Sequence, residues 1–231
     1  MKILIGCPTS DRYEYCVSLW LNRVKEIIAF SKAHDIDYLL VDNSKSEDFF
    51  KKLKSRGVNI VKSPYFEDVR ERIAHSRNIL REKALEENYD YFFSLEQDII
   101  PPVDILDKML GHGKKIVSAY YGKPADLRVQ DKETEEIKDI TIELSIVWLQ
   151  EGDKIRRANP SEVLDKGLIS VGGFGVGCLM INREVLEKIK FRFEKGKAAF
   201  DDMLFCLDAK KRGYELFLDS NIRVEHLHKP W

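Results

Sequence analysis

The first 95 residues alternate short apolar runs with longer stretches of helical spacing, and this rhythm restricts the possible folds more than any other feature. It predicts a βαβαβαβ order and therefore an α/β fold, with a mostly parallel sheet covered by helices on both faces. Ligands of such sheets bind beyond the carboxyl ends of the strands, so the residues that follow each strand are the first candidates for a site. The expected strands are residues 3–7, 38–41, 58–61 and 91–95, and the expected helices are residues 13–31, 44–57 and 69–87.

The rhythm changes after an expected strand at residues 116–120. Residues 123–139 are polar and rich in charge, which predicts a loop or an irregular hairpin. The alternation of apolar and polar residues from Ile140 to Trp148 predicts an antiparallel strand. Two short helices, at residues 183–190 and 201–212, and a last strand at residues 222–225 complete the expected order.

Composition excludes several classes of function. The 231 residues carry a formal net charge of -1, without the basic excess that marks nucleic-acid binding. The four cysteines are scattered and have no zinc-binding spacing, so we expect buried thiols in a reducing compartment. No apolar run has the length of a membrane span, and the first residues do not resemble a signal peptide. We therefore expect a cytoplasmic protein, and an association with a membrane surface stays open.

Two acidic residues follow the expected strand at residues 91–95. Along an extended chain, Glu96 and Asp98 would point the same way. Their hard oxygens at the carboxyl end of a buried strand suit Mg²⁺ or Mn²⁺ carrying a substrate diphosphate. An isolated acid-x-acid triplet is more often an ordinary loop, so its position after the strand and the other segments of the chain must support this interpretation.

At this point the chain resembles the glycosyltransferases of the GT-A fold, in particular the large inverting family 2. Members carry an Asp-x-Asp type motif after a strand of this kind, and Glu96-Gln97-Asp98 corresponds to it with Glu in place of the first Asp. The resemblance implies that Asp98 is a direct metal ligand and that Glu96 approaches the ribose or the water shell of the metal. It also implies one GT-A domain over residues 1–231, with a nucleotide-binding half at 1–100 and an acceptor-binding half at 101–231.

Further segments of the first half match the donor side of that family. Pro8, Thr9 and Asp11 follow the first strand, where members place a Pro-Thr segment beside the nucleotide. The resemblance implies that Asp42 binds the base, although Asp42-Asn43-Ser44 is equally a good turn and helix cap. Arg77 matches a pattern of the Ala-Arg-Asn type. It is a candidate to bind the diphosphate or to support the acidic loop through a bidentate pair, and the alternative is an ordinary surface arginine.

The second half matches the acceptor side. The glycine-rich segment 171–178 resembles an acceptor loop, and tight packing of strands is the alternative explanation for its glycines. Asp201 and Asp202 open the expected helix at residues 201–212, where family members show an acidic pair. The resemblance makes Asp202 the candidate general base and Asp201 its neighbour at the acceptor. The helix dipole also favours acids in a first turn, so capping alone would explain both.

Two histidines near the end of the sequence complete the candidate metal site. His226 and His228 have the spacing that points both side chains the same way along a strand. In metal-dependent GT-A enzymes a histidine of this terminal segment often completes the metal shell, and the register favours His226 over His228. The expected cofactor is Mn²⁺ or Mg²⁺, with Asp98, His226 and Glu96 as the candidate metal residues.

The resemblance implies a metal-dependent hexosyltransferase that moves a sugar from a UDP- or GDP-sugar to an acceptor hydroxyl with inversion. The sequence lacks the Gln-x-x-Arg-Trp motif and the membrane helices of the family's processive synthases, which favours transfer of one sugar at a time. Two alternatives are a sugar-nucleotide nucleotidyltransferase and a non-catalytic subunit that binds a nucleotide sugar. Nucleotidyltransferases of this kind carry a glycine-rich loop with an arginine after the first strand, and Cys7-Pro8-Thr9-Ser10 is not such a loop.

Overall fold

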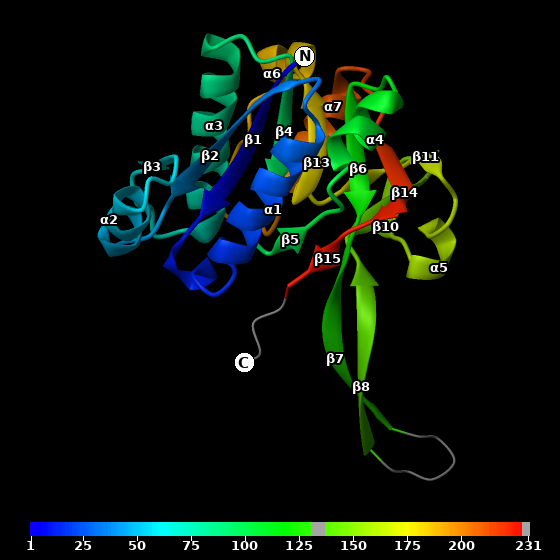
Figure 1. Ribbon diagram of the computed structural model, residues 1–231. Coiled ribbons are helices and arrows are strands. Elements are labelled where there is room, and N and C mark those ends of the chain that lie inside the picture. Colours follow the sequence, from blue (N-terminus) through cyan, green and yellow to red (C-terminus); the bar gives the residue numbers. More distant parts are fainter. Residues whose placement is uncertain (131–136, 228–231) are drawn as a thin grey trace.

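The computed structural model describes residues 1–130 and 137–227, and its centre is an eight-stranded sheet (Figure 1). The strand order is β11-β14-β6-β13-β4-β1-β2-β3. β13 is antiparallel to both of its neighbours and β11 to β14, while the other four neighbouring pairs are parallel, as the rhythm of the sequence predicted. The strands are β1 (Lys2–Thr9), β2 (Asp35–Asp42), β3 (Ile60–Lys62), β4 (Tyr91–Leu95), β6 (Ile116–Tyr120), β11 (Leu168–Ser170), β13 (Cys178–Asn182) and β14 (Phe217–Arg223).

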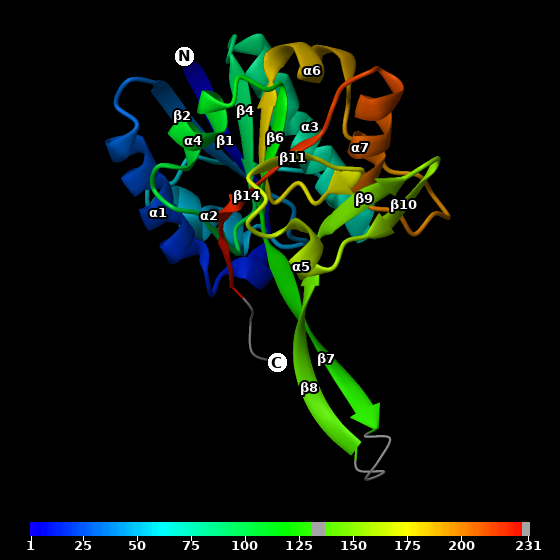
Figure 2. The same ribbon diagram turned by 90° about the vertical axis from the view of Figure 1, so that its right-hand side faces the viewer.

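Helices cover both faces of this sheet because alternate strand residues point into two separate cores (Figure 2). In β1, for example, Ile3 and Ile5 belong to the core under α1, α2 and α4, whereas Leu4 belongs to the core under α3, α6 and α7. The helices are α1 (Val17–Phe30), α2 (Asp48–Ser55), α3 (Val69–Glu86), α4 (Ile105–Gly111), α5 (Pro160–Val163), α6 (Arg183–Lys188) and α7 (Asp201–Lys211).

Two expected helix starts are wrong. The first long helix begins at Val17 rather than Tyr13, because a short 3-10 helix, η1 (Asp11–Tyr13), precedes it. Ser44 does not cap α2: its hydroxyl bonds instead to the carboxylate of Asp42, at 2.5 Å. The loop after β2 therefore uses its polar residues to fix its own shape next to β1.

The polar segment after β6 is more regular than the sequence predicts. β7 (Gly122–Gln130) and β8 (Ile137–Ser145) pair over their whole described length, and residues 131–136 lie outside the described part. The alternation that favoured a strand at residues 140–148 is present in β8, and a separate strand, β9 (Val147–Glu151), continues after a break. Each strand supplies the backbone partners of the other, so a polar sequence can still form a ladder. Both views show this ribbon extending away from the main body (Figures 1 and 2).

Two small sheets lie beside the main one. β9 pairs with β10 (Lys154–Arg157) and with β12 (Gly173–Phe174). β5 (Ile99–Ile100) pairs with β15 (Glu225–His226), which joins the loop after β4 to the segment after β14. Within the described residues, no helix is both long enough and apolar enough to cross a membrane.

Candidate functional site

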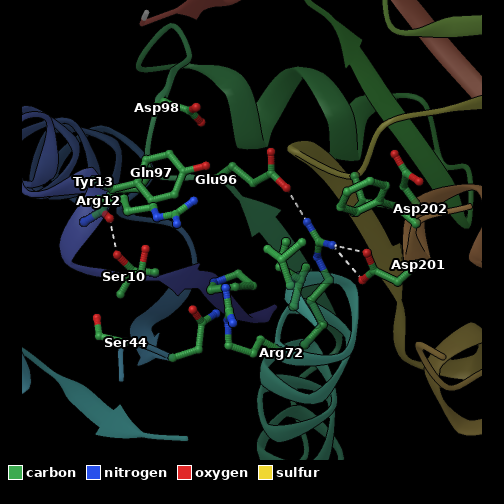
Figure 3. A pocket seen from close by; sticks show the side chains of 18 of the residues that line it. Ser10, Arg12, Tyr13, Ser44, Arg72, Glu96, Gln97, Asp98, Asp201 and Asp202 are labelled. Carbon is green, nitrogen blue, oxygen red and sulfur yellow. Dashed lines mark hydrogen bonds and ion pairs between the residues drawn. The ribbon is translucent and has the colours of Figure 1, made fainter. Parts of the chain in front are cut away.

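A cavity of about 450 Å³ opens at the carboxyl ends of β1, β2 and β4 (Figure 3). The chain passes from β1 to β2 and β3 on one side and returns through α3 to β4 on the other, so the cavity lies where the strand order reverses. This is the position at which open α/β sheets bind ligands. Its walls are residues 8–13, 43–45, 65, 69, 72, 73 and 77 from one half of the chain, followed by residues 96–98, 121, 146, 176, 200–202 and 226.

Asp98 and His226 meet in this cavity although 128 positions separate them. The pairing of β15 with β5 brings them together, and the backbone N–H of Leu227 donates to the carbonyl of Asp98 at 2.7 Å. His226 Nε2 lies 3.3 Å from Asp98 Oδ2. The register that favoured His226 therefore agrees with its position, while His228 lies outside the described residues.

The orientation of His226 is fixed by its other ring nitrogen. Nδ1 lies 2.8 Å from the carbonyl oxygen of Gly122, an acceptor only, so Nδ1 carries the proton and Nε2 faces Asp98. The ring also packs edge-on against Tyr121, with centroids 5.8 Å apart. Burial opposes a positive charge on the ring, but the hydrogen bond and the negative charge of Asp98 outweigh it and raise the pKa of His226.

The carboxylate of Asp98 is a hard oxygen ligand that suits Mn²⁺ or Mg²⁺, and the imidazole nitrogen that faces it is a ligand type preferred by transition metals. Among residues 1–130 and 137–227, no group of three or more His, Cys, Asp or Glu side chains is arranged to hold an ion. An ion held by Asp98 and His226 would thus need most of its shell from water or from ligand oxygens, which is how Mg²⁺ is usually bound with nucleotide phosphates.

Glu96 does not join this pair. The chain leaves the extended conformation after Leu95, so the alternation that would place Glu96 and Asp98 on one side ends before them. The Glu96 carboxylate forms an ion pair with Arg77 instead. Burial raises the pKa of Glu96 to about 6, and the neighbouring carboxylates add to this against the opposing charge of Arg77.

Arg77 is a buried residue of the site rather than a surface arginine, with 2% of its side chain exposed. One terminal nitrogen donates to both carboxylate oxygens of Asp201, at 2.8 and 2.6 Å, and the other contacts Glu96. Of the two roles open for Arg77 in the sequence, the geometry matches support of the acidic residues. Asp201 itself is buried, and its carboxylate is fully engaged by this arginine.

Asp202 has a different environment from its neighbour, as Figure 3 shows. Its Oδ1 accepts the backbone N–H of Met203 at 2.6 Å, and within the described ranges no cation lies at ion-pair distance from it. Burial and the charge of Asp201 raise the pKa of Asp202 to about 6, against smaller opposing effects that include Arg77. A carboxylate with this pKa is ionised at neutral pH and still able to take up a proton.

The expected donor-side residues divide into two groups. Pro8, Thr9 and Asp11 line the cavity, and the Asp11 backbone N–H donates to Ser44 Oγ at 2.8 Å. Asp42 is not part of the wall. It is fully buried, and its carboxylate accepts from Lys62 Nζ at 2.7 Å as well as from Ser44. The turn interpretation of Asp42 therefore describes its observed contacts, and Asn43 and Ser44 present the loop to the cavity instead.

Sequence reasoning missed a basic and aromatic part of the wall. Tyr65 follows β3, and its ring lies 4.7 Å from the guanidinium of Arg72 and 5.4 Å from the ammonium of Lys45. Arg12 and Tyr13 line the cavity from η1. Their positions after strand ends were a usable signal, but nothing in the spacing distinguished them from other surface residues.

Gln97 was also missed. Its side-chain oxygen is hydrogen-bonded to the hydroxyl of Thr9, and the pair joins the ends of β1 and β4. Gln97 is buried, and Thr9 satisfies its side-chain oxygen, whereas its Nε2 has no hydrogen-bond partner among the described residues. The middle residue of the acidic triplet therefore belongs to the frame of the cavity.

The glycine-rich segment packs tightly against these residues. Gly177 donates its backbone N–H to the hydroxyl oxygen of Tyr121 at 2.8 Å, and its carbonyl accepts from the Glu96 backbone. A Cβ at position 177 would lie 2.7 Å from the Tyr121 hydroxyl and 2.8 Å from Glu96 Oε2, so any larger residue would require these side chains to shift. Tight packing thus accounts for this glycine.

The sequence matches no protein-family model and no curated protein. Several solved structures are similar. TarS residues 1–349 from S. aureus in complex with UDP-GlcNAc superimposes with a TM-score of 0.61 at 15% identity over 100% of this chain, and a second structure of TarS residues 1–349 gives 0.58 at 14% over 96%. The complex with UDP gives 0.56 at 13% over 96%. This chain spans 59% of each of those structures. The likeness shows a GT-A-like fold with a large, mostly parallel central sheet.

Proposed function

We propose that this protein is a glycosyltransferase that moves a sugar from a nucleotide diphosphate to an acceptor hydroxyl. The observation that carries the proposal is that one cavity holds both the Asp98–His226 pair and Asp202. The pair is suited to a diphosphate with its cation, and Asp202 is suited to remove a proton at neutral pH. The cavity occurs in a GT-A-like fold whose similar structure, TarS, was solved with UDP-GlcNAc and with UDP.

The donor occupies the part of the cavity beside β1 and β2 in this proposal. Arg12, Lys45 and Arg72 supply positive charge there, which suits the phosphates, and Tyr65 offers a ring face. Asp98 and His226 would hold the divalent ion. When bound, Mn²⁺ or Mg²⁺ neutralises the charge that develops on the leaving nucleoside diphosphate.

The acceptor approaches from the side of α7. As its hydroxyl oxygen forms the new bond to the anomeric carbon, the bond from that carbon to the diphosphate breaks and Asp202 takes the hydroxyl proton. Attack from the face opposite the leaving group gives inversion, and we propose that one sugar is added per encounter. The anomeric configuration of the product and its chain length test these two points by NMR and mass spectrometry.

The test begins with binding. UDP-, GDP- and dTDP-sugars are screened, with Mn²⁺ and with EDTA, for an increase in the melting temperature, and UDP-GlcNAc is the first donor tried. We expect Mn²⁺-dependent stabilisation that D98A abolishes and D202N retains. With a stabilising donor, release of nucleoside diphosphate supports the proposal. Release of pyrophosphate would instead indicate a nucleotidyltransferase, and tight binding without turnover would indicate a non-catalytic subunit.

A further inference from the structure

Arg77 connects the two sides of the cavity through a single guanidinium. One nitrogen contacts Glu96, which precedes Asp98 by two residues, and the other contacts Asp201 at the start of α7; the dashed lines that leave Glu96 and Asp201 in Figure 3 mark these interactions. The side chain comes from α3, in the middle of a helix that packs under β1, so its position is fixed by the core. This buried arginine links two loops that share no backbone hydrogen bond in the part of the chain that the structure describes.

The link distinguishes the two neighbouring acids of α7. Asp201 gives both of its oxygens to Arg77, at 2.8 and 2.6 Å. Asp202 has neither of these bonds and lines the same cavity. Adjacent residues of a helix point about 100° apart, so fixing Asp201 also fixes the direction in which Asp202 projects.

We propose that Arg77 is a positioning residue that holds Asp201 so that Asp202 serves as the base, and that ties α7 to the loop carrying Asp98. This inference deepens the proposed function and rests on it for the identity of the reaction. It assigns Arg77 no contact with the substrate. The guanidinium acts only through the two carboxylates that it bonds.

The charge around Asp202 gives the proposal a second observable. Removing Arg77 would leave two carboxylates beside Asp202 without their cation, which disfavours its ionised form. The groups that face Asp202 are Asp201 from its own helix, Cys206 one turn further, Arg77 from α3, Glu96 after β4 and Tyr121 after β6. Among these groups Arg77 is the one cation, so its loss moves the titration of Asp202 upward.

The experiment compares R77K and R77M with R81M. Arg81 lies one turn along the same helix and is also buried, but its Nε donates to the carbonyls of Leu186 and Ile189 at 2.7 and 2.8 Å, away from the cavity. R81M therefore controls for loss of a buried arginine of α3. The Asp202 carboxyl is titrated by ¹³C NMR, with D202N to assign its signal, and sugar transfer is measured at saturating donor.

We expect R77M to raise the pKa of Asp202 by about one unit or more, because the variant lacks the positive charge. We expect R77K to lower sugar transfer about 100-fold, because the lysine ammonium cannot bond both Glu96 and Asp201. R81M should change neither the pKa of Asp202 nor the rate of sugar transfer per folded molecule. In R77M/D201N, which lacks the unpaired charge at position 201, stability should recover while transfer stays low. Wild-type transfer in R77K, or an unmoved Asp202 titration in R77M, would overturn the proposal. The titration needs no substrate, so it decides on Arg77 even if no donor reacts.

Discussion

Replacing Asp202 by Asn should stabilise the protein while it removes transfer. Burial and Asp201 move the pKa of Asp202 from 3.8 to about 6, so the ionised side chain opposes folding at neutral pH. A difference of about two units corresponds to about 3 kcal/mol at most. We expect about 1–2 kcal/mol in practice, since the Asn oxygen keeps the bond from the Met203 backbone while its NH₂ group finds no matching acceptor.

The sign and the pH range of this effect are specific. A carboxyl whose folded pKa is raised destabilises the folded state fully above about pH 6, and the penalty vanishes below its unfolded value near 4. Urea unfolding of wild type and D202N at pH 7.5 should therefore show the variant to be more stable, and the gap should close by pH 4. A variant that is less stable at pH 7.5, or a gap independent of pH, would refute the account of Asp202.

Three further outcomes are expected. The acid limb of the pH profile of kcat/KM should lie near pH 6, because Asp202 must be ionised to act as the base, and activity should fall about tenfold between pH 7 and pH 5. An acid limb near pH 4 would exclude Asp202 as the base. H226A should weaken Mn²⁺-dependent donor binding about 10–100-fold, as measured by calorimetry. The melting temperature of the ligand-free variant should stay within a few degrees of wild type in a thermal-shift assay. G177A should lower stability by about 1–3 kcal/mol in urea unfolding, since the new methyl group would overlap Tyr121 and Glu96; an unchanged midpoint would show that the segment can move aside.

The fold was predictable because its signals are local. Each buried strand and each helix of the first half has its own pattern, and the position of the cavity follows from the general rule for parallel sheets. The ribbon of β7 and β8 was predicted less well, since its strands are defined by pairing with each other rather than by burial.

That Asp98 and His226 lie in one cavity was predictable from their places near the ends of strands, and their role as metal ligands stays a prediction. Glu96 shows the limit of that reasoning, because the chain turns immediately before it and its carboxylate meets an arginine 19 positions earlier. The contact between Arg77 and Asp201 spans 124 positions, and no spacing rule addresses such a pair. The sequence therefore suggested which residues matter, while the partners of the charged groups required the structure.

The short pairing of β5 with β15 makes the proposed cation site depend on a long-range contact. His226 reaches Asp98 only after the chain has closed a loop of more than a hundred residues, and loop closure of that length is slow compared with local structure formation. During refolding we therefore expect the main sheet to form before the ability to bind Mn²⁺ appears. Because only two residues of each strand take part, fraying of this segment would also release the ion while the rest of the molecule stays folded.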